Sequence, residues 1–155
     1  MPGVVIAEED PRAEDVRALL VRHREWAGGH TPPEDVHALD LDAVVDPTVV
    51  FFTAREDGVL LGTGALKLRG ADAEIKSMHT VADARGRGVA RAVLGRLLAE
   101  ARARECTRVD LETGSMEAFA PARQLYASAG FTTTGPFGDY VASPYSTFMT
   151  LSLDG

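Results

Sequence analysis

Cysteine is almost absent from this 155-residue sequence, which contains only Cys106. A single cysteine excludes an internal disulfide and a cysteine-based zinc site. The sequence also lacks a long apolar run, and acidic residues stand near its start at Glu8, Glu9 and Asp10. We therefore expect neither a signal peptide nor a membrane-spanning helix, and the cytoplasm is the expected location. The four histidines show no metal-ligand spacing, so we expect no metal.

Basic side chains are fewer than acidic ones, with 16 Lys and Arg against 23 Asp and Glu and a formal net charge of -7. This balance argues against nucleic acid or an anionic membrane as a partner. It is compatible with an amine substrate, but it does not by itself indicate one. The hydrophobic content of 45% and the length favour a globular chain with one domain over residues 1–155.

Hydrophobic periodicity and turn residues predict a mixture of strands and helices. Strands are predicted over residues 4–7, 49–55, 59–68, 73–80, 108–113, 131–134 and 147–153, and helices over residues 12–27, 33–45, 87–104 and 118–129. We expect Gly28 and Gly29 to end the first helix, and Asp57 with Gly58 to form a hairpin turn. This order predicts an α+β fold with a mixed, mostly antiparallel sheet of about seven strands and about four helices.

The most informative stretch is residues 73–98, which form a predicted strand, a glycine-bearing loop and an amphipathic helix. The helix begins in the loop, so its first backbone N–H groups suit a phosphate or pyrophosphate. The GxxxxGK[ST] motif of nucleotide-binding loops is absent, and a GxGxxG pattern fails because Arg91 holds its third small position. A tight turn made by Gly86 and Gly88, with no ligand, is the alternative.

Two motifs resemble those of the GCN5-related N-acetyltransferase (GNAT) superfamily. The loop is similar to the [RQ]-x-x-G-x-[GA] signature at Arg85, Gly88 and Ala90. Residues 122–131, ARQLYASAGF, resemble the second motif A-x-x-L-Y-x-x-x-G-F. The motifs stand in the order found in the family, and the predicted element order resembles the GNAT fold as well. The resemblance implies an acyl-CoA N-acyltransferase fold with acetyl-CoA as the acyl donor.

The resemblance also implies which residues hold coenzyme A. Backbone N–H groups of residues 85–91 would bind the pyrophosphate, and residues 78–80 would pair with the pantetheine arm. The implied cofactor-binding residues are Met78, His79, Thr80, Arg85, Gly86, Arg87, Gly88, Val89, Ala90 and Arg91. The alternative for the arginines is plain solvent exposure. One position departs from the family, because Phe119 stands where relatives often have an asparagine, and any cofactor contact of that asparagine must be lost or moved.

Acetyl transfer to an amine needs a base, because an alkyl amine with a pKa of about 10.4 is almost fully protonated at neutral pH. Glu74 lies eleven positions before Arg85, and the resemblance implies a catalytic base at this spacing. The alternatives are a solvated strand glutamate and a proton relay through water. Tyr126 matches the tyrosine that protonates the leaving thiolate in many relatives. Its alternative role is that of a core aromatic beside Phe131.

The candidates on the acceptor side are Trp26, His30, Glu112, Asp139 and Tyr140. In relatives, the corresponding regions are a strand that separates from that of the base and loops that line or cover the acceptor site. Each of these residues could instead be an ordinary turn or surface residue.

The sequence thus predicts direct acetyl transfer to a primary amine of a small molecule, an amino acid or a peptide. We expect a monomer or homodimer, with no nucleic acid or membrane partner. The alternative from another functional class is a non-catalytic module that binds acyl-CoA to sense it or to join a partner. Retention of Glu74 and Tyr126 speaks weakly against that module.

Overall fold

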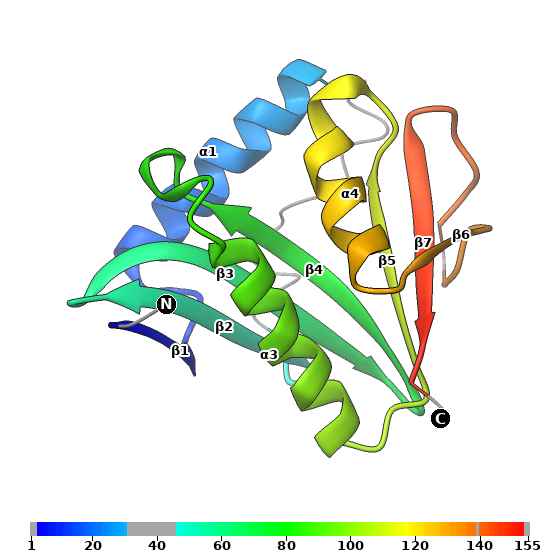
Figure 1. Ribbon diagram of the computed structural model, residues 1–155, viewed down its shortest axis with the longest axis horizontal. Helices are drawn as coiled ribbons and strands as arrows, with labels where there is room; N and C mark the ends of the chain where they lie inside the picture. Colours follow the sequence, from blue (N-terminus) through cyan, green and yellow to red (C-terminus); the bar gives the residue numbers. More distant parts are fainter. Residues whose placement is uncertain (1–2, 31–45, 139, 154–155) are drawn as a thin grey trace.

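The computed structural model describes residues 3–30, 46–138 and 140–153, which form a seven-stranded sheet flanked by helices (Figure 1). The strands are β1 (Val4–Glu8), β2 (Val49–Glu56), β3 (Val59–Arg69), β4 (Asp72–Thr80), β5 (Arg108–Gly114), β6 (Thr132–Thr134) and β7 (Ser146–Ser152). The α-helices among the described residues are α1 (Glu14–His30), α3 (Val89–Ala103) and α4 (Ala120–Ser128). Two short 3-10 turns, η2 (Ala82–Ala84) and η3 (Glu117–Phe119), precede α3 and α4.

The strand order is β1-β2-β3-β4-β5-β7-β6. Neighbouring strands are antiparallel except β4 and β5, which run parallel. This arrangement confirms the predicted mixed and mostly antiparallel sheet. The helix predicted over residues 33–45 lies outside the described residues. None of the helices in the described ranges is long and apolar enough to cross a membrane.

The first helix corrects one prediction, because α1 continues through Gly28 and Gly29 and ends at His30. A glycine inside a helix costs about 1 kcal/mol relative to alanine, which weakens a helix without breaking it. The helix is anchored earlier in its sequence, where Val16, Leu19 and Leu20 are buried. The packing of these buried residues therefore outweighs the weak helix-ending effect of the two glycines.

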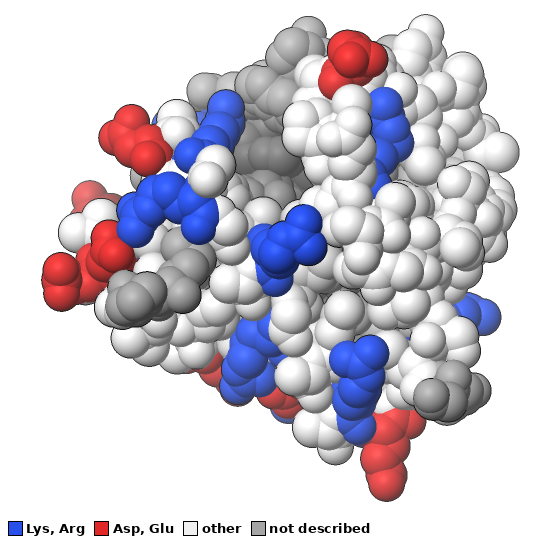
Figure 2. Space-filling model, in the orientation of Figure 1, with Lys and Arg blue, Asp and Glu red and all other residues white. Residues whose placement is uncertain are grey.

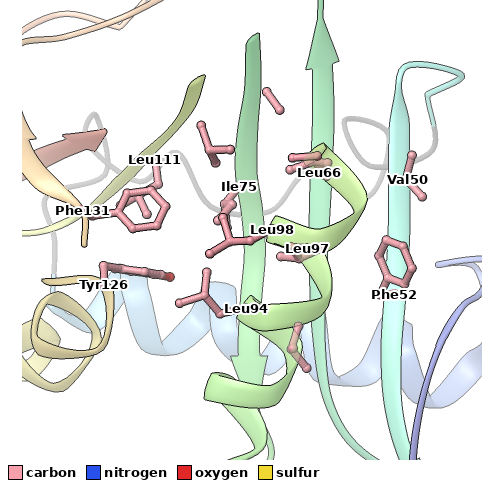
Figure 3. Close-up of a cluster of buried hydrophobic side chains, with 14 of the residues drawn as sticks. Val50, Phe52, Leu66, Ile75, Leu94, Leu97, Leu98, Leu111, Tyr126 and Phe131 are labelled. Atoms are coloured by element: carbon pink, nitrogen blue, oxygen red, sulfur yellow. The ribbon is translucent and has the colours of Figure 1, made fainter. Parts of the chain in front are cut away.

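The helices α3 and α4 lie on one face of the sheet, and α1 lies on the other (Figure 1). Gly64 on β3 lets α3 approach closely, because a Cβ there would lie 2.5 Å from Val93 and 3.0 Å from Leu97. Glycines within a strand often mark such a close approach. Gly62 serves the same packing, because a Cβ there would lie 2.9 Å from Val89 of α3. The main core lies between this face and α3 (Figure 3).

An irregularity in β4 shapes the middle of the sheet. Its register against β3 shifts between the pair Ala65–Lys76 and the pair Thr63–His79, so that β4 contains one extra residue. Ser77 in this bulge has a φ of 55°, a left-handed conformation that is rare outside glycine. The hydroxyl of Thr63 donates to the Ser77 carbonyl at 2.8 Å and helps to hold the bulge.

The strands β4 and β5 are paired only at one end. Their paired residues run from Asp72 with Arg108 to Ile75 with Leu111, although both strands continue beyond these residues. Among the described residues, the remainder of β4 therefore has no strand partner on its β5 side. The molecular surface has a hollow in the region where these strands separate (Figure 2). The loop before α3 lies on one side of this hollow, and α4 lies on the other.

Candidate active site

The loop before α3 presents backbone N–H groups at a helix N-terminus. Gly86 and Gly88 have φ values of 79° and 83°, which side-chain-bearing residues rarely adopt. The first bond of the α3 ladder runs from the Ala92 N–H to the Gly88 carbonyl at 3.0 Å, so the amides of the preceding first turn have no partner within the helix. The N–H groups of Arg85 and Arg87 are used in local turns instead. The available donors are thus concentrated in residues 88–91.

Three arginines surround this loop, and they differ in their partners. Arg85 is exposed, whereas Arg87 donates to both carboxylate oxygens of Glu56 at 3.0 Å. Arg91 reaches the Ser128 hydroxyl at 3.4 Å. Figure 2 shows basic side chains at the rim of the hollow near the start of α3. A helix N-terminus, an exposed loop of positive φ and nearby arginines fit a pyrophosphate group.

The three strand residues expected to contact a pantetheine arm lie where β4 has separated from β5. Met78, His79 and Thr80 all follow Ile75, the last β4 residue paired with β5. Main-chain N–H and C=O groups on such an edge can pair with an extended ligand as a further strand would. His79 is 8% exposed and pairs in register with Thr63 of β3.

Glu74 lies on the face of the sheet opposite α3. Side chains alternate along a strand, and its neighbours Ala73 and Ile75 belong to the core beneath α3. Glu74 is only 3% exposed. The Tyr140 hydroxyl donates to Glu74 Oε2 at 2.6 Å, and Lys76 Nζ lies 3.5 Å from the same oxygen. The sequence candidates Glu74 and Tyr140 are therefore brought into direct contact.

Tyr140 belongs to a small aromatic cluster that rests on this face. Its ring lies 5.1 Å from the Phe137 ring and 5.7 Å from the Phe148 ring, measured between centroids. Burial raises the pKa of the Tyr140 hydroxyl, and the hydrogen bond to Glu74 raises it further. The hydroxyl consequently stays protonated at neutral pH and acts as a donor to the carboxylate.

A second buried carboxylate, Asp110 of β5, lies beside Glu74 in the sheet register. Asp110 is 2% exposed, accepts a hydrogen bond from Thr150 at 2.7 Å, and accepts another from Arg108 at 3.1 Å. Arg69 of β3 lies 3.9 Å from both Asp110 and Glu74. The result is a cluster of charged side chains on the Glu74 face, each supplied by a central strand.

Tyr126 lies on α4 and is 6% exposed. It packs edge-on against Phe131 with centroids 5.8 Å apart, and Figure 3 shows its ring extending from α4 toward Leu94. Burial raises the pKa of its hydroxyl, so the phenol is protonated at neutral pH. Phe119 stacks on Gly114, where an added Cβ would lie 2.3 Å from the ring. The position that holds asparagine in many relatives is therefore used for packing.

Comparisons with known proteins agree with this geometry. The model of the Acetyltransferase (GNAT) family matches residues 13–131. The Bacillus subtilis N-acetyltransferase YsnE, itself uncharacterized, is 43% identical over 146 residues, which cover 94% of this chain and 97% of that protein. The chain belongs to the GNAT family.

Further relatives extend this result. The IAA acetyltransferase of Azospirillum brasilense is 38% identical, over 96% of this chain and 97% of that protein. A crystal structure from Klebsiella pneumoniae, assigned as an acyl-CoA N-acyltransferase, is 27% identical with a TM-score of 0.80 over 97% of this chain and 98% of its own. Membership in the GNAT family makes this chain an acyltransferase, and the non-catalytic alternative loses its support.

The structure describes the side chains of only some of the remaining acceptor-side candidates of this GNAT chain. Glu112 is half-buried on β5, just beyond the last residue paired with β4. Trp26 and His30 lie in the last part of α1, where only the backbone is described, and Asp139 lies outside the described residues. The structure thus places Glu112 and Tyr140 on or near the Glu74 face and leaves the other three candidates untested.

Sequence reasoning missed three charged residues of this face. Arg69, Lys76 and Asp110 contact or neighbour Glu74, although none was a candidate. A signal was present for Lys76 and Asp110, because charged residues occupy every second position in 72–76 and again in 108–112. Alternation of this kind places charged residues on one face, which is usually a solvated face. Only the three-dimensional arrangement shows that Lys76 is half-buried and Asp110 is buried.

Proposed function

We propose that this chain is an acetyl-CoA-dependent N-acetyltransferase that transfers an acetyl group directly to a primary amine of a small molecule, an amino acid or a peptide. One observation carries the proposal. Glu74 is buried, ordered by Tyr140, and located beside the point where β4 and β5 separate. A carboxylate in this position can serve the acceptor, while the first turn of α3 serves the donor.

The donor side follows from the loop and the open strand edge. Backbone N–H groups of residues 88–91, with Arg85 and Arg91 nearby, would hold the pyrophosphate. The edge of β4 at residues 78–80 would pair with the pantetheine arm, and an N–H near Met78 would donate to the thioester carbonyl oxygen. Bound acetyl-CoA supplies an acetyl thioester, whose carbonyl carbon is open to attack by a neutral amine.

Glu74 would remove a proton from the acceptor ammonium, directly or through one water molecule. The amine nitrogen then forms a bond to the acetyl carbon, the carbon–sulfur bond breaks, the thiolate leaves, and the nitrogen loses its second proton to water. Tyr126 would return a proton to that sulfur, since burial keeps its hydroxyl protonated. Proton removal and proton return are thus assigned to different sides of the sheet.

Direct transfer is supported by the environment of the single cysteine. Cys106 is buried in the main core after the end of α3, and burial raises its pKa. A thiol in this state is a poor nucleophile. Cys106 is therefore not suited to form an acetyl-cysteine intermediate.

The deciding experiment is a thiol-release assay with acetyl-CoA against a panel of amines, amino acids and lysine peptides. We expect release that depends on one class of acceptor, with the acetylated product visible by mass spectrometry. Tight binding of coenzyme A without release from any acceptor would contradict the proposed activity. Release with propionyl-CoA but not acetyl-CoA would contradict only the choice of donor.

A further inference from the structure

Arg69 is a cation on the Glu74 face with poor partners. Its guanidinium lies 3.9 Å from Glu74 and 3.9 Å from Asp110, which is longer than a hydrogen bond. Its Nε is buried, and no acceptor in the described part of the chain reaches it. Leaving a buried donor unsatisfied costs roughly 1–3 kcal/mol. The side chain therefore has hydrogen-bonding capacity that a ligand could use.

The two neighbouring carboxylates do not depend on this arginine. Asp110 already has hydrogen bonds from Thr150 and Arg108. Glu74 already has the short hydrogen bond from Tyr140. Both carboxylates are therefore held by closer donors, and the guanidinium can turn its N–H groups to another acceptor without leaving either of them unpaired.

The Arg69 guanidinium lies over an aromatic ring. The Arg69 Cζ lies 5.1 Å from the centre of the Phe137 ring. A stacked guanidinium keeps its planar fork of N–H donors, which matches the two oxygens of a carboxylate. The Arg69 side chain is 29% exposed and that of Lys76 is 19% exposed, so both cations can be reached from solvent.

We propose that Arg69, assisted by Lys76, binds a carboxylate of the acceptor, which is therefore an amino acid or a similar small amino-carboxylate. Glu74 would face the amine of that molecule while the two cations hold its acid group. A polyamine would instead bring a second positive charge toward Arg69 and Lys76. The inference rests on the proposed acetyl transfer and narrows its acceptor.

The test compares each protein amino acid with its primary amide, which keeps the amine and the side chain but removes the negative charge. For the amino acids that are acetylated, we expect the amide to have a KM at least about tenfold higher, with a smaller change in kcat. Equal KM values for acid and amide, or a preference for the amide, would overturn the inference while leaving the N-acetyltransferase activity intact.

Variants of Arg69 make the test specific. R69Q is expected to raise the KM for the amino acid at least about tenfold and to leave the KM for the amide within about twofold, while R69K gives an intermediate effect because it keeps the charge but loses the fork. R104Q removes an exposed arginine at the end of α3 and serves as the matched control, with no change for either acceptor. Equal losses for acid and amide in R69Q would contradict a carboxylate contact.

A binding measurement separates this inference from the proposed activity. The same amino acids and amides are titrated calorimetrically into the wild-type protein and R69Q, with desulfo-coenzyme A present. Amino-acid binding that R69Q weakens would support the carboxylate site even if no acetyl transfer occurred. Absence of amino-acid binding by the wild-type protein, or binding that R69Q does not weaken, would refute it.

Discussion

At the scale of single residues, the environment of Glu74 decides what its carboxylate can do. One carboxylate oxygen accepts a hydrogen bond from the Tyr140 hydroxyl at 2.6 Å and lies 3.5 Å from Lys76 Nζ. The other has no contact shorter than the 3.9 Å to Arg69 among the interactions found in the described residues. Glu74 is thus held through one oxygen, and in the proposed mechanism the second oxygen accepts the proton from the acceptor or from a water molecule.

Glu74→Gln and Tyr126→Phe should each lower kcat by roughly ten- to ten-thousandfold, because each change removes a proton-transfer group and keeps the side-chain shape. The affinity for coenzyme A should stay nearly unchanged, since neither residue belongs to the loop before α3. Steady-state kinetics and calorimetry would measure the two quantities. Glu117→Gln, an exposed position of η3, is the control. Unchanged turnover in both variants would remove these roles without affecting the fold.

At the scale of elements, small residues and one arginine join the helices to the sheet. Gly64 allows α3 to pack directly on β3, as the close approach of Val93 and Leu97 shows. On the other face, Arg55 of β2 bridges Glu9 at 2.7 Å and Asp15 of α1 at 2.6 Å. Each of these contacts fixes a helix that carries or supports part of the site.

Gly64→Ala should destabilise the protein by roughly 1–3 kcal/mol, because the new methyl group would overlap α3 side chains in a filled core. Gly95→Ala is the matched control on α3, where an added Cβ meets nothing within 4 Å. Alanine is the better helix former, so this control should be slightly more stable than the wild type. Urea unfolding measures both, and equal stability of the two variants would contradict the close packing.

The Arg55 bridge predicts a dependence of stability on pH. Hydrogen bonds from Arg55 hold the pKa values of Glu9 and Asp15 below their usual range. Their contribution to folding is therefore complete above about pH 4 to 5 and is lost as the pH falls further. Arg55→Gln should reduce this loss between pH 6 and pH 3, by an amount on the order of 1 kcal/mol because the groups are partly exposed. The measurement is the free energy of unfolding in urea at several pH values. An identical dependence of this free energy on pH in the wild type and in Arg55→Gln would exclude the linkage.

At the scale of the whole molecule, the proposed donor side and the proposed acceptor side lie on opposite faces of the sheet. The start of α3 lies against one face, whereas Glu74, Arg69 and Asp110 lie on the other. Within the described sheet, the pairing of β4 with β5 ends at Ile75 and Leu111, although both strands continue. Both substrates could therefore approach independently and meet there.

If the two substrates approach independently, coenzyme A should bind without an acceptor present. Saturating coenzyme A should raise the melting temperature of the wild type, since a ligand at 100 times its Kd adds about 2.7 kcal/mol. Gly88→Glu should abolish this shift, because it places a carboxylate at the anion site. Gly58→Glu has a similar φ of 81° in an open turn and controls for backbone strain. A full shift in Gly88→Glu would refute the loop as the cofactor site.

The sequence predicted the succession of strands along the chain and placed the start of α3 within two residues, because alternating or helical apolar patterns extend over whole elements there. It could not predict the bulge at Ser77, since the extra residue follows from pairing with β3 and has no composition of its own. It also missed Arg69, whose meaning depends on Phe137, about 70 residues away along the chain. Motifs in the sequence name candidate residues such as Glu74 and Tyr126, whereas Arg69 comes beside Glu74 only through long-range contacts.

Beyond Ile75, no described strand pairs with β4 on its β5 side, and this has a consequence for hydrogen exchange. Amides on an open strand edge are bonded to water, so they exchange through local access to solvent rather than through global unfolding. A ligand arm that lies along this edge would slow the exchange of every second amide, because only alternate N–H groups point toward it. Deuterium uptake, residue by residue, would therefore measure how far the arm extends into the sheet, with no acceptor and no turnover required.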